Sequence, residues 1–282
     1  METFIEIIKS IFYGIIEGIT EWLPISSTGH LILFESLFWK TANENFMEMF
    51  RVVIQLGAIL AVIVMFFKKL NPFSSKKDAI AKRSTWEMWL KVIIACLPAA
   101  AIGLPFDDLL DKVFYNFPTV AITLIIYGVA FIILESSKRP EPKITDISNM
   151  PYKTALFIGL IQLLSLIPGT SRSGVTILGA MLLGCSRMVA AEFSFFLAIP
   201  VMFGASLLKC ASYAKDMISG EAAIMSSLEI IVLLVGMAVA FVVSLLAIRF
   251  LTEYVKRKNF KPFGYYRIIL GIILLGYFFI FM

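Results

Sequence analysis

The chain has 282 residues, of which 59% are hydrophobic and 16% charged, and a formal net charge of +5. Soluble domains contain about 45–50% apolar and about 25% charged residues, so this composition excludes an ordinary water-soluble fold. The lysines and arginines stand in short loops beside apolar runs, where membrane topology explains them better than nucleic-acid binding does. We therefore predict one all-α integral membrane domain over residues 1–282 that binds no nucleic acid.

Six segments are long and apolar enough to cross a bilayer, which takes about 20 residues as a helix. These segments are residues 48–67, 88–106, 113–134, 190–208, 230–248 and 263–281. Three loops rich in lysine and arginine, at 68–83, 138–153 and 249–261, are predicted to face the cytoplasm by the positive-inside rule. The acidic turn at 107–111 and the stretch 209–229 are then predicted to lie on the outer side.

Two further apolar stretches are interrupted in the middle. Residues 4–34 contain Pro24-Ile-Ser-Ser-Thr-Gly29, and residues 154–184 contain Pro168-Gly-Thr-Ser-Arg-Ser-Gly174. The halves of residues 154–184, of about 14 and 10 residues, are each too short to span a bilayer. If 154–184 crossed once, the basic loop at 249–261 would face outside, so we predict that this segment enters and leaves on the same side. Both interrupted stretches are thus predicted to be re-entrant helix-loop-helix segments.

The two interrupted stretches also share a pattern. Gly14, Glu17 and Gly29 have the same spacing as Gly159, Gln162 and Gly174, and three predicted spans follow each set. This pattern predicts an inverted-topology repeat, with repeat one at 1–135 and repeat two at 150–282. In such repeats the broken helices meet near the bilayer midplane, where we expect the functional site.

Two glutamates precede the first break at a helical i,i+4 spacing, so Glu17 and Glu21 share a helix face. Their charges would repel unless a cation lay between them, and Mg²⁺ or Ca²⁺ binds carboxylates together with phosphate oxygens. We predict that both residues hold such a cation beside a pyrophosphate. A simpler alternative is an ion pair between Glu17 and Arg172 that only joins the repeats, but it leaves Glu21 and His30 unexplained.

Both breaks offer hydroxyls and free backbone N–H groups at the start of a half-helix, where the helix dipole favours anions. Routine N-capping would explain either loop alone, but two such loops with Arg172 could cradle several phosphate oxygens. The predicted substrate-binding residues are Glu17, Ser26, Thr28, Gly29, Thr170, Ser171, Ser173 and Gly174. His30, the only histidine, lies one helical turn after Ser27 and could act as a general base or acid.

Three runs resemble the motifs of the undecaprenyl-diphosphate phosphatases, also called bacitracin-resistance proteins. They are Glu17-Gly-Ile-Thr-Glu-Trp-Leu-Pro-Ile-Ser-Ser-Thr-Gly-His30, Val53-Ile-Gln-Leu-Gly57 and Pro168-Gly-Thr-Ser-Arg-Ser-Gly174, and the resemblance extends through Glu192-Phe-Ser-Phe195. The family's acidic motif, serine-rich loop and arginine loop map onto these runs. Arg51 departs from the pattern, because we expect an acidic residue there.

The resemblance implies that the protein removes the terminal phosphate of undecaprenyl diphosphate, with Mg²⁺ or Ca²⁺, at the outer side of the bacterial cytoplasmic membrane. The monophosphate product carries cell-wall precursors. We predict Glu21, Ser27, His30 and Arg172 as catalytic residues: Arg172 neutralises phosphate charge, Ser27 attacks or positions water, and His30 with Glu21 moves protons. The sequence leaves open whether Ser27 becomes phosphorylated or a metal-bound water attacks.

Three other functions compete with this interpretation. A carrier or flippase of polyprenyl phosphate would share the repeat architecture but would not need the His-Ser-Glu cluster. A phosphatidic-acid-type phosphatase uses two histidines, and this chain has one. A purely structural subunit gives no reason for polar loops inside the membrane. The sequence does not decide between a monomer and a homodimer, nor does it fix the preferred metal or the prenyl chain length.

Overall fold

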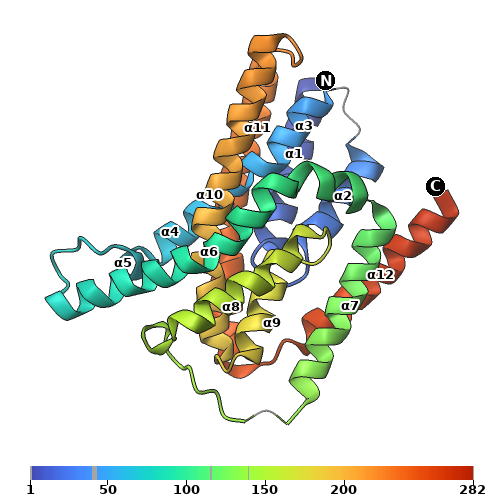
Figure 1. The fold of residues 1–282 in the computed structure, drawn as a ribbon. Helices are drawn as coiled ribbons and strands as arrows, with labels where there is room; N and C mark the ends of the chain where they lie inside the picture. The colour runs from blue at the N-terminus through green and yellow to red at the C-terminus, as the bar shows by residue number, and fades with distance from the viewer. Residues whose placement is uncertain (1, 40–42, 115, 139, 282) are drawn as a thin grey trace.

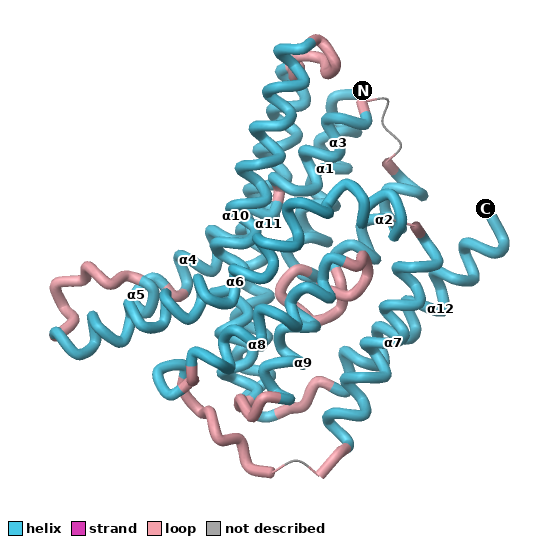
Figure 2. The backbone as a smooth tube through the Cα atoms, in the orientation of Figure 1, coloured by secondary structure: helices cyan, strands magenta, loops and turns pink. Residues whose placement is uncertain are grey.

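The computed structural model describes residues 2–39, 43–114, 116–138 and 140–281, which form α-helices and two short 3₁₀ helices (Figures 1 and 2). The first half contains α1 (Glu2–Thr20), α2 (Ser27–Phe38), α3 (Glu44–Val53), α4 (Gln55–Met65), α5 (Phe67–Leu70), α6 (Ala79–Phe114) and α7 (Phe117–Ser136). The second half contains η1 (Ile147–Asn149), α8 (Tyr152–Gln162), η2 (Leu163–Leu166), α9 (Arg172–Leu182), α10 (Arg187–Ser219), α11 (Ser227–Arg257) and α12 (Lys261–Phe281). The all-α prediction is confirmed.

All six predicted spans coincide with helical segments that could cross a membrane. They are Glu44–Met65, Ala79–Gly103, Phe117–Ser136, Arg187–Ser219, Ser227–Arg257 and Lys261–Ile280. The helices α10 and α11 are longer than predicted. At about 1.5 Å per residue each is roughly 45–50 Å long, whereas the hydrocarbon core is about 30 Å thick, so their ends extend beyond it.

The predicted turn at 107–111 is wrong, because α6 continues through it to Phe114. No glycine or proline follows Pro105 in this stretch, so the backbone has no local reason to leave the helix there. Helix α7 begins after Asn116, whose side chain accepts a hydrogen bond from the backbone N–H of Thr119 and caps the helix. The side chains of the three aspartates lie outside the described residues.

Both predicted breaks are present. The first separates α1 from α2 between Thr20 and Ser27, and the second separates α8 from α9 between Gln162 and Arg172. Figure 2 shows the connecting loops near the centre of the molecule, surrounded by helices. The half-helices on either side have 11 to 19 residues.

The two halves of the chain exchange packing partners. The helix α1 packs on α11 of the other half, and α8 packs in the same way on α6. Helix α7 packs on α12, and α4 packs on α10. In each of these four pairs, a helix of the first half packs on a helix of the second half.

Glycines allow these helix pairs to approach closely. A Cβ atom at Gly128 of α7 would lie 2.7 Å from the carbonyl oxygen of Gly264 of α12, and one at Gly159 of α8 would lie 2.3 Å from the carbonyl oxygen of Ala95 of α6. Small residues at such positions are typical of helix interfaces in membranes, where association depends on backbone proximity and van der Waals packing.

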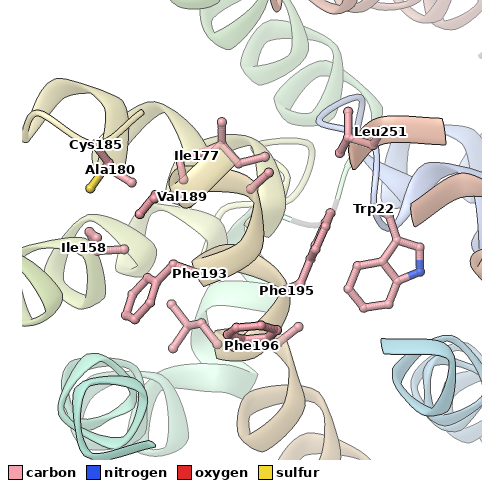
Figure 3. Close-up of a cluster of buried hydrophobic side chains, with 14 of the residues drawn as sticks. Trp22, Ile158, Ile177, Ala180, Cys185, Val189, Phe193, Phe195, Phe196 and Leu251 are labelled. Atoms are coloured by element: carbon pink, nitrogen blue, oxygen red, sulfur yellow. The ribbon is translucent and has the colours of Figure 1, made fainter. Parts of the chain in front are cut away.

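A buried aromatic cluster lies beside the first break (Figure 3). Trp22 is fully buried, and its ring packs edge-on against Phe195 of α10 at a centroid distance of 5.5 Å. Phe193 and Phe196 of the same helix are also fully buried. The loop after α1 is thus fixed by core packing immediately next to Glu21.

Arg51, the residue that departs from the family pattern, forms an ion pair in the first half. Its guanidinium donates to both carboxylate oxygens of Glu35 in α2, at 2.5 to 3.0 Å. Glu35 also accepts a hydrogen bond of 2.8 Å from the Tyr13 hydroxyl of α1. These contacts fix α2, which carries Ser27 and His30, against α1 and α3.

Candidate active site

The two breaks share an unusual backbone conformation. Ser26 and Ser171 have φ angles of 73° and 71°, and they are the non-glycine residues with positive φ in the described part of the chain. Each stands three residues before a glycine, Gly29 or Gly174, and directly before a half-helix. Such a conformation costs about 1–3 kcal/mol for a residue with a side chain, and strain of this kind is concentrated at functional sites.

The glycines of the two loops allow close packing. A Cβ at Gly174 would lie 3.0 Å from Nη1 of Arg267 and 3.2 Å from Cβ of Ser171, and one at Gly29 would lie 3.0 Å from Cδ1 of Leu124. The Ser171 hydroxyl accepts a hydrogen bond from the backbone N–H of Gly174, which caps α9. The first turns of both half-helices are therefore packed tightly against their neighbours.

Ser173 and Arg172 connect the second loop to the first. The Ser173 hydroxyl donates to the backbone carbonyl of Glu21 at 3.0 Å. The Arg172 guanidinium donates to a carboxylate oxygen of Glu21 at 2.8 Å and to the carbonyl of Ser194 at 2.8 Å. Arg172 also lies over the Trp22 ring, 5.8 Å from its centroid. Residues from both breaks thus meet at Glu21.

Glu21 is the centre of this cluster. One carboxylate oxygen accepts from Arg172, and the other accepts a hydrogen bond of 3.0 Å from the Ser27 hydroxyl. The Glu21 and Arg172 side chains are about nine-tenths buried. A carboxylate that accepts a hydrogen bond from an alcohol in a site shielded from water is placed to remove the alcohol's proton.

Glu17 lies one helical turn before Glu21, since the backbone N–H of Glu21 donates to the carbonyl of Glu17 at 3.0 Å. Glu17 is fully buried and close enough to interact electrostatically with Glu21 and Arg172. Neither of its carboxylate oxygens has a hydrogen-bond partner among the described residues. Arg172 pairs with Glu21 rather than with Glu17, so a Glu17–Arg172 ion pair does not account for this carboxylate.

Other buried polar atoms without partners occur at the same place. Within the described chain, they include the indole nitrogen of Trp22, the hydroxyl of Ser26, the side-chain amide of Gln162 and Nε of Arg172. Buried polar groups are normally hydrogen-bonded, because an unsatisfied one costs about 1–3 kcal/mol. All of these atoms belong to residues in or next to the two breaks. Their concentration fits a site whose polar partners belong to a bound ligand.

These residues also fit a divalent cation. Two carboxylates one helical turn apart, one of them without a protein partner, supply the oxygen ligands that Mg²⁺ and Ca²⁺ prefer. The described residues contain no group of three or more His, Cys, Asp and Glu side chains that could hold a metal. A cation held by Glu17 and Glu21 would therefore take its remaining ligands from water and from phosphate oxygens.

His30 has partners other than Ser27 in this structure. Its Nδ1 lies 2.7 Å from the carbonyl oxygen of Ser26, and its Nε2 lies 2.7 Å from the hydroxyl of Tyr266. The rings of His30 and Tyr266 are stacked, with centroids 5.5 Å apart and an interplanar angle of 8°. A carbonyl can only accept, so in the neutral imidazole Nδ1 carries the hydrogen and Nε2 accepts from Tyr266.

Arg267 of α12 joins both loops and was not identified in the sequence analysis. It is fully buried and donates to the carbonyls of Pro24, Gly169 and Thr170 at 2.9 to 3.2 Å. No carboxylate within the described ranges forms an ion pair with it. The sequence does contain a signal for it, because Arg267 stands inside an apolar span. Placing an arginine inside a membrane is energetically costly, so such a residue is retained mainly for function or pairing. Tyr266 next to it had no comparable signal.

The remaining predicted residues also lie at the two breaks. Thr170 is buried, and its carbonyl accepts from Arg267. Thr28 is half-buried in the first turn of α2, next to Gly29. The structure therefore brings all the predicted site residues to the two breaks and the helix ends beside them, with Glu21, Ser27, Arg172 and Ser173 in direct contact and His30 directed toward Tyr266.

Comparison with known proteins identifies relatives over nearly the whole chain. Residues 10–273 match the family model described as bacitracin resistance protein BacA. A protein of Enterococcus faecalis named undecaprenyl-diphosphatase is 59% identical to this chain over 276 residues, which is 97% of this chain and 98% of the relative. A protein of the same name from Acetivibrio thermocellus is 58% identical over 275 residues, again 97% of this chain and 98% of the relative. One from Streptococcus mutans is 60% identical over 276 residues, 97% of this chain and 96% of the relative. The chain therefore belongs to the BacA family of bacitracin resistance proteins.

Proposed function

We propose that this protein hydrolyses undecaprenyl diphosphate to undecaprenyl phosphate and inorganic phosphate. The relatives' shared name supports this reaction, and the observation that carries it is the contact of Glu21 with both Ser27 and Arg172. The cluster supplies the Arg172 guanidinium for phosphate oxygens, the Ser27 alcohol, and the Glu21 carboxylate that can accept the alcohol's proton. The unpartnered polar atoms around it supply further phosphate contacts.

The reaction can begin in two ways. In the first, the Ser27 oxygen attacks the terminal phosphorus, Glu21 takes its proton, and undecaprenyl phosphate leaves. Water then hydrolyses the phosphoserine and regenerates Ser27. In the second, Ser27 binds the phosphate and water attacks directly. In both, Arg172 neutralises charge on the phosphate oxygens. Glu17 and Glu21 would hold Mg²⁺ or Ca²⁺, which would supply further positive charge for the same oxygens.

The direct test is phosphate release from undecaprenyl diphosphate by the purified protein, with and without a chelator. We expect release that stops when the chelator removes divalent cations and resumes when Mg²⁺ or Ca²⁺ is added in excess. Absence of release under all conditions, together with movement of labelled polyprenyl phosphate across vesicle membranes, would favour the carrier function instead. The exchanged packing of the two halves is the observation that keeps this second candidate open.

The nucleophile can be identified by rapid acid quenching of the enzyme with substrate labelled in its terminal phosphate. Phosphoserine survives acid, so a label recovered on the peptide containing Ser27 is expected on the covalent route. On that route Ser27→Ala should also lose nearly all turnover. If water attacks directly, the alanine variant should bind substrate more weakly and keep measurable turnover. An acid-labile label on His30 would contradict both routes.

Tyr266 is expected to position His30. Tyr266→Phe keeps the stacked ring and removes only the hydroxyl, so kcat should fall about tenfold with little change in KM. The control is Tyr265→Phe, which changes the exposed neighbouring tyrosine and should have no effect on either constant. Because His30 is the only histidine, ¹⁵N-histidine NMR gives a single imidazole signal pair. We expect the Nδ1–H tautomer in the unmodified protein and a shifted Nε2 resonance in Tyr266→Phe. Equal effects of the two tyrosine variants would argue against this role.

We also propose that both interrupted stretches are re-entrant and that the halves at 1–135 and 150–282 form an inverted repeat, with the site open to the outer side of a bacterial cytoplasmic membrane. The exchanged packing of α1 on α11 and α8 on α6 supports this arrangement, as do the matching φ angles of Ser26 and Ser171. The positive charge near Lys258 supports a cytoplasmic location for the α11–α12 loop.

Single cysteines introduced into a cysteine-free variant test this topology. An impermeant thiol reagent added outside should label a cysteine at position 216, in the last turn of α10, and should not label one at position 77, 140 or 258. Position 109, near the end of α6, should also be labelled. Labelling of position 258 from outside would mean that 154–184 crosses the membrane once, and it would contradict the inverted repeat.

A further inference from the structure

The segment that connects α5 to α6 projects from the side of the molecule. Figures 1 and 2 show α5, the following turn and the first part of α6 standing clear of the other helices. The first part of α6 runs across the direction of α10 and α11 rather than along it (Figure 1). We refer to residues 67–87 as the α5–α6 hairpin. A segment that projects sideways from membrane-crossing helices near a basic loop can lie along the membrane surface.

Large apolar side chains on the α5–α6 hairpin are exposed. The exposed fractions are 78% for Phe73, 81% for Ile80 and 52% for Trp86. The rings of Phe73 and Trp86 pack edge-on at 5.6 Å, so the turn and the helix present one joint apolar surface. Tryptophan and phenylalanine beside basic residues are typical of segments that lie at the membrane interface.

The same hairpin carries unpaired positive charge. Six of its residues are lysine or arginine, and two, Asp78 and Glu87, are acidic. Lys69 pairs with Glu192, and Arg83 pairs with Glu87. The side-chain amines of Lys68, Lys76 and Lys82 form no hydrogen bond or ion pair with any described residue. These three amines remain available to an anionic partner.

A cavity at the base of the hairpin combines both kinds of surface. It has a volume of about 390 Å³ and is lined by Val64, Met65, Phe66, Phe67, Lys68 and Lys69. Four of these lining residues are apolar and two are basic. A lipid with an acyl chain and an anionic headgroup matches this composition, because the chain can contact the apolar residues while the headgroup reaches the free amine of Lys68.

We propose that the α5–α6 hairpin lies in the headgroup region of the membrane and binds anionic phospholipids. Phe73, Ile80 and Trp86 contact the upper parts of the acyl chains. The amines of Lys68, Lys76 and Lys82 bind headgroup phosphates. The hairpin's charge, its exposed apolar surface and its sideways course each fit this partner. The inference does not depend on the proposed enzymatic reaction, because none of these residues belongs to the candidate active site.

The depth of the hairpin is the first test. Ile80→Cys in a cysteine-free variant is labelled with a polarity-sensitive fluorophore and reconstituted into vesicles of phosphatidylglycerol and phosphatidylcholine. Lipids that carry a nitroxide high on the acyl chain should quench this label, and aqueous iodide should not. The same label at Glu141, in the exposed loop between α7 and α8, serves as the control and should be quenched by iodide only. Iodide quenching at both positions would overturn the proposal.

Charge dependence is the second test. The triple variant Lys68→Gln, Lys76→Gln, Lys82→Gln should bind phosphatidylglycerol at least about tenfold more weakly in native mass spectrometry, since each lysine near an anionic lipid contributes roughly a fivefold change. The matched control is Lys138→Gln, Lys143→Gln, Lys258→Gln, which removes the same charge elsewhere and should bind nearly as the unmodified protein does. Phosphatidylcholine binding should be unchanged in both. Equal phosphatidylglycerol binding by the two triple variants, or displacement of the bound lipid by undecaprenyl phosphate, would contradict the proposal.

Discussion

Arg172→Ala is expected to reduce phosphate release from undecaprenyl diphosphate about 10²–10³-fold, the range seen when one donor to a developing negative charge is removed. Arg172 reaches Glu21 from the other break, so it is placed to neutralise phosphate oxygens beside Ser27. Arg172→Lys should recover only part of the rate, because an ammonium group lacks the planar pair of N–H donors that matches phosphate.

The matched control for Arg172 is Arg187→Ala. Arg187, the first residue of α10, also forms an ion pair, with Glu135 of α7. This pair lies away from the two breaks. This variant should keep most of its activity, although it loses a partly buried ion pair. Thermal unfolding of all three variants separates loss of chemistry from loss of structure. Full activity in a folded Arg172→Ala protein would remove Arg172 from the site.

Glu21→Gln is expected to have a similarly large effect, of about 10²–10⁴ in kcat, because the amide keeps the shape of the side chain but cannot accept the Ser27 proton. It also leaves the Arg172 charge without its carboxylate partner. Glu48→Gln, which removes the carboxylate from the exposed pair with Lys209, is the control and should be nearly as active as the unmodified protein. Comparable kcat values for the two variants would exclude Glu21 as the base.

Much of the fold could be predicted from the sequence because a bilayer restricts the possibilities. Apolar length determines which segments can cross, and the proline and glycine clusters mark where a helix must end. The six spans and both breaks follow from these rules. The end of α6 did not, because charge at 107–111 suggested a turn although the local sequence permits a helix.

The candidate site could be predicted in composition but not in connectivity. Helical spacing placed Glu17 near Glu21 and His30 near Ser27, and both pairs are one turn apart in the structure. Spacing along one helix cannot say which partner a side chain takes from a distant segment. Ser27 donates to Glu21 across the break, and His30 binds Tyr266 from α12. Arg267 could have been noticed as an arginine inside an apolar span, but its partners, two loops far away in sequence, could not be predicted.

Residues from both breaks are proposed to form one phosphate-binding site, and a double-mutant cycle on phosphate release tests this arrangement most directly. Glu21→Asp and Arg172→Lys keep the charges and shift their positions, so each should retain measurable activity alone. Because the two side chains are in contact, the combined variant should lose less than the sum of the single losses, with a coupling of at least about 1 kcal/mol. Losses that add within about 0.5 kcal/mol would show two independent sites and would contradict the account.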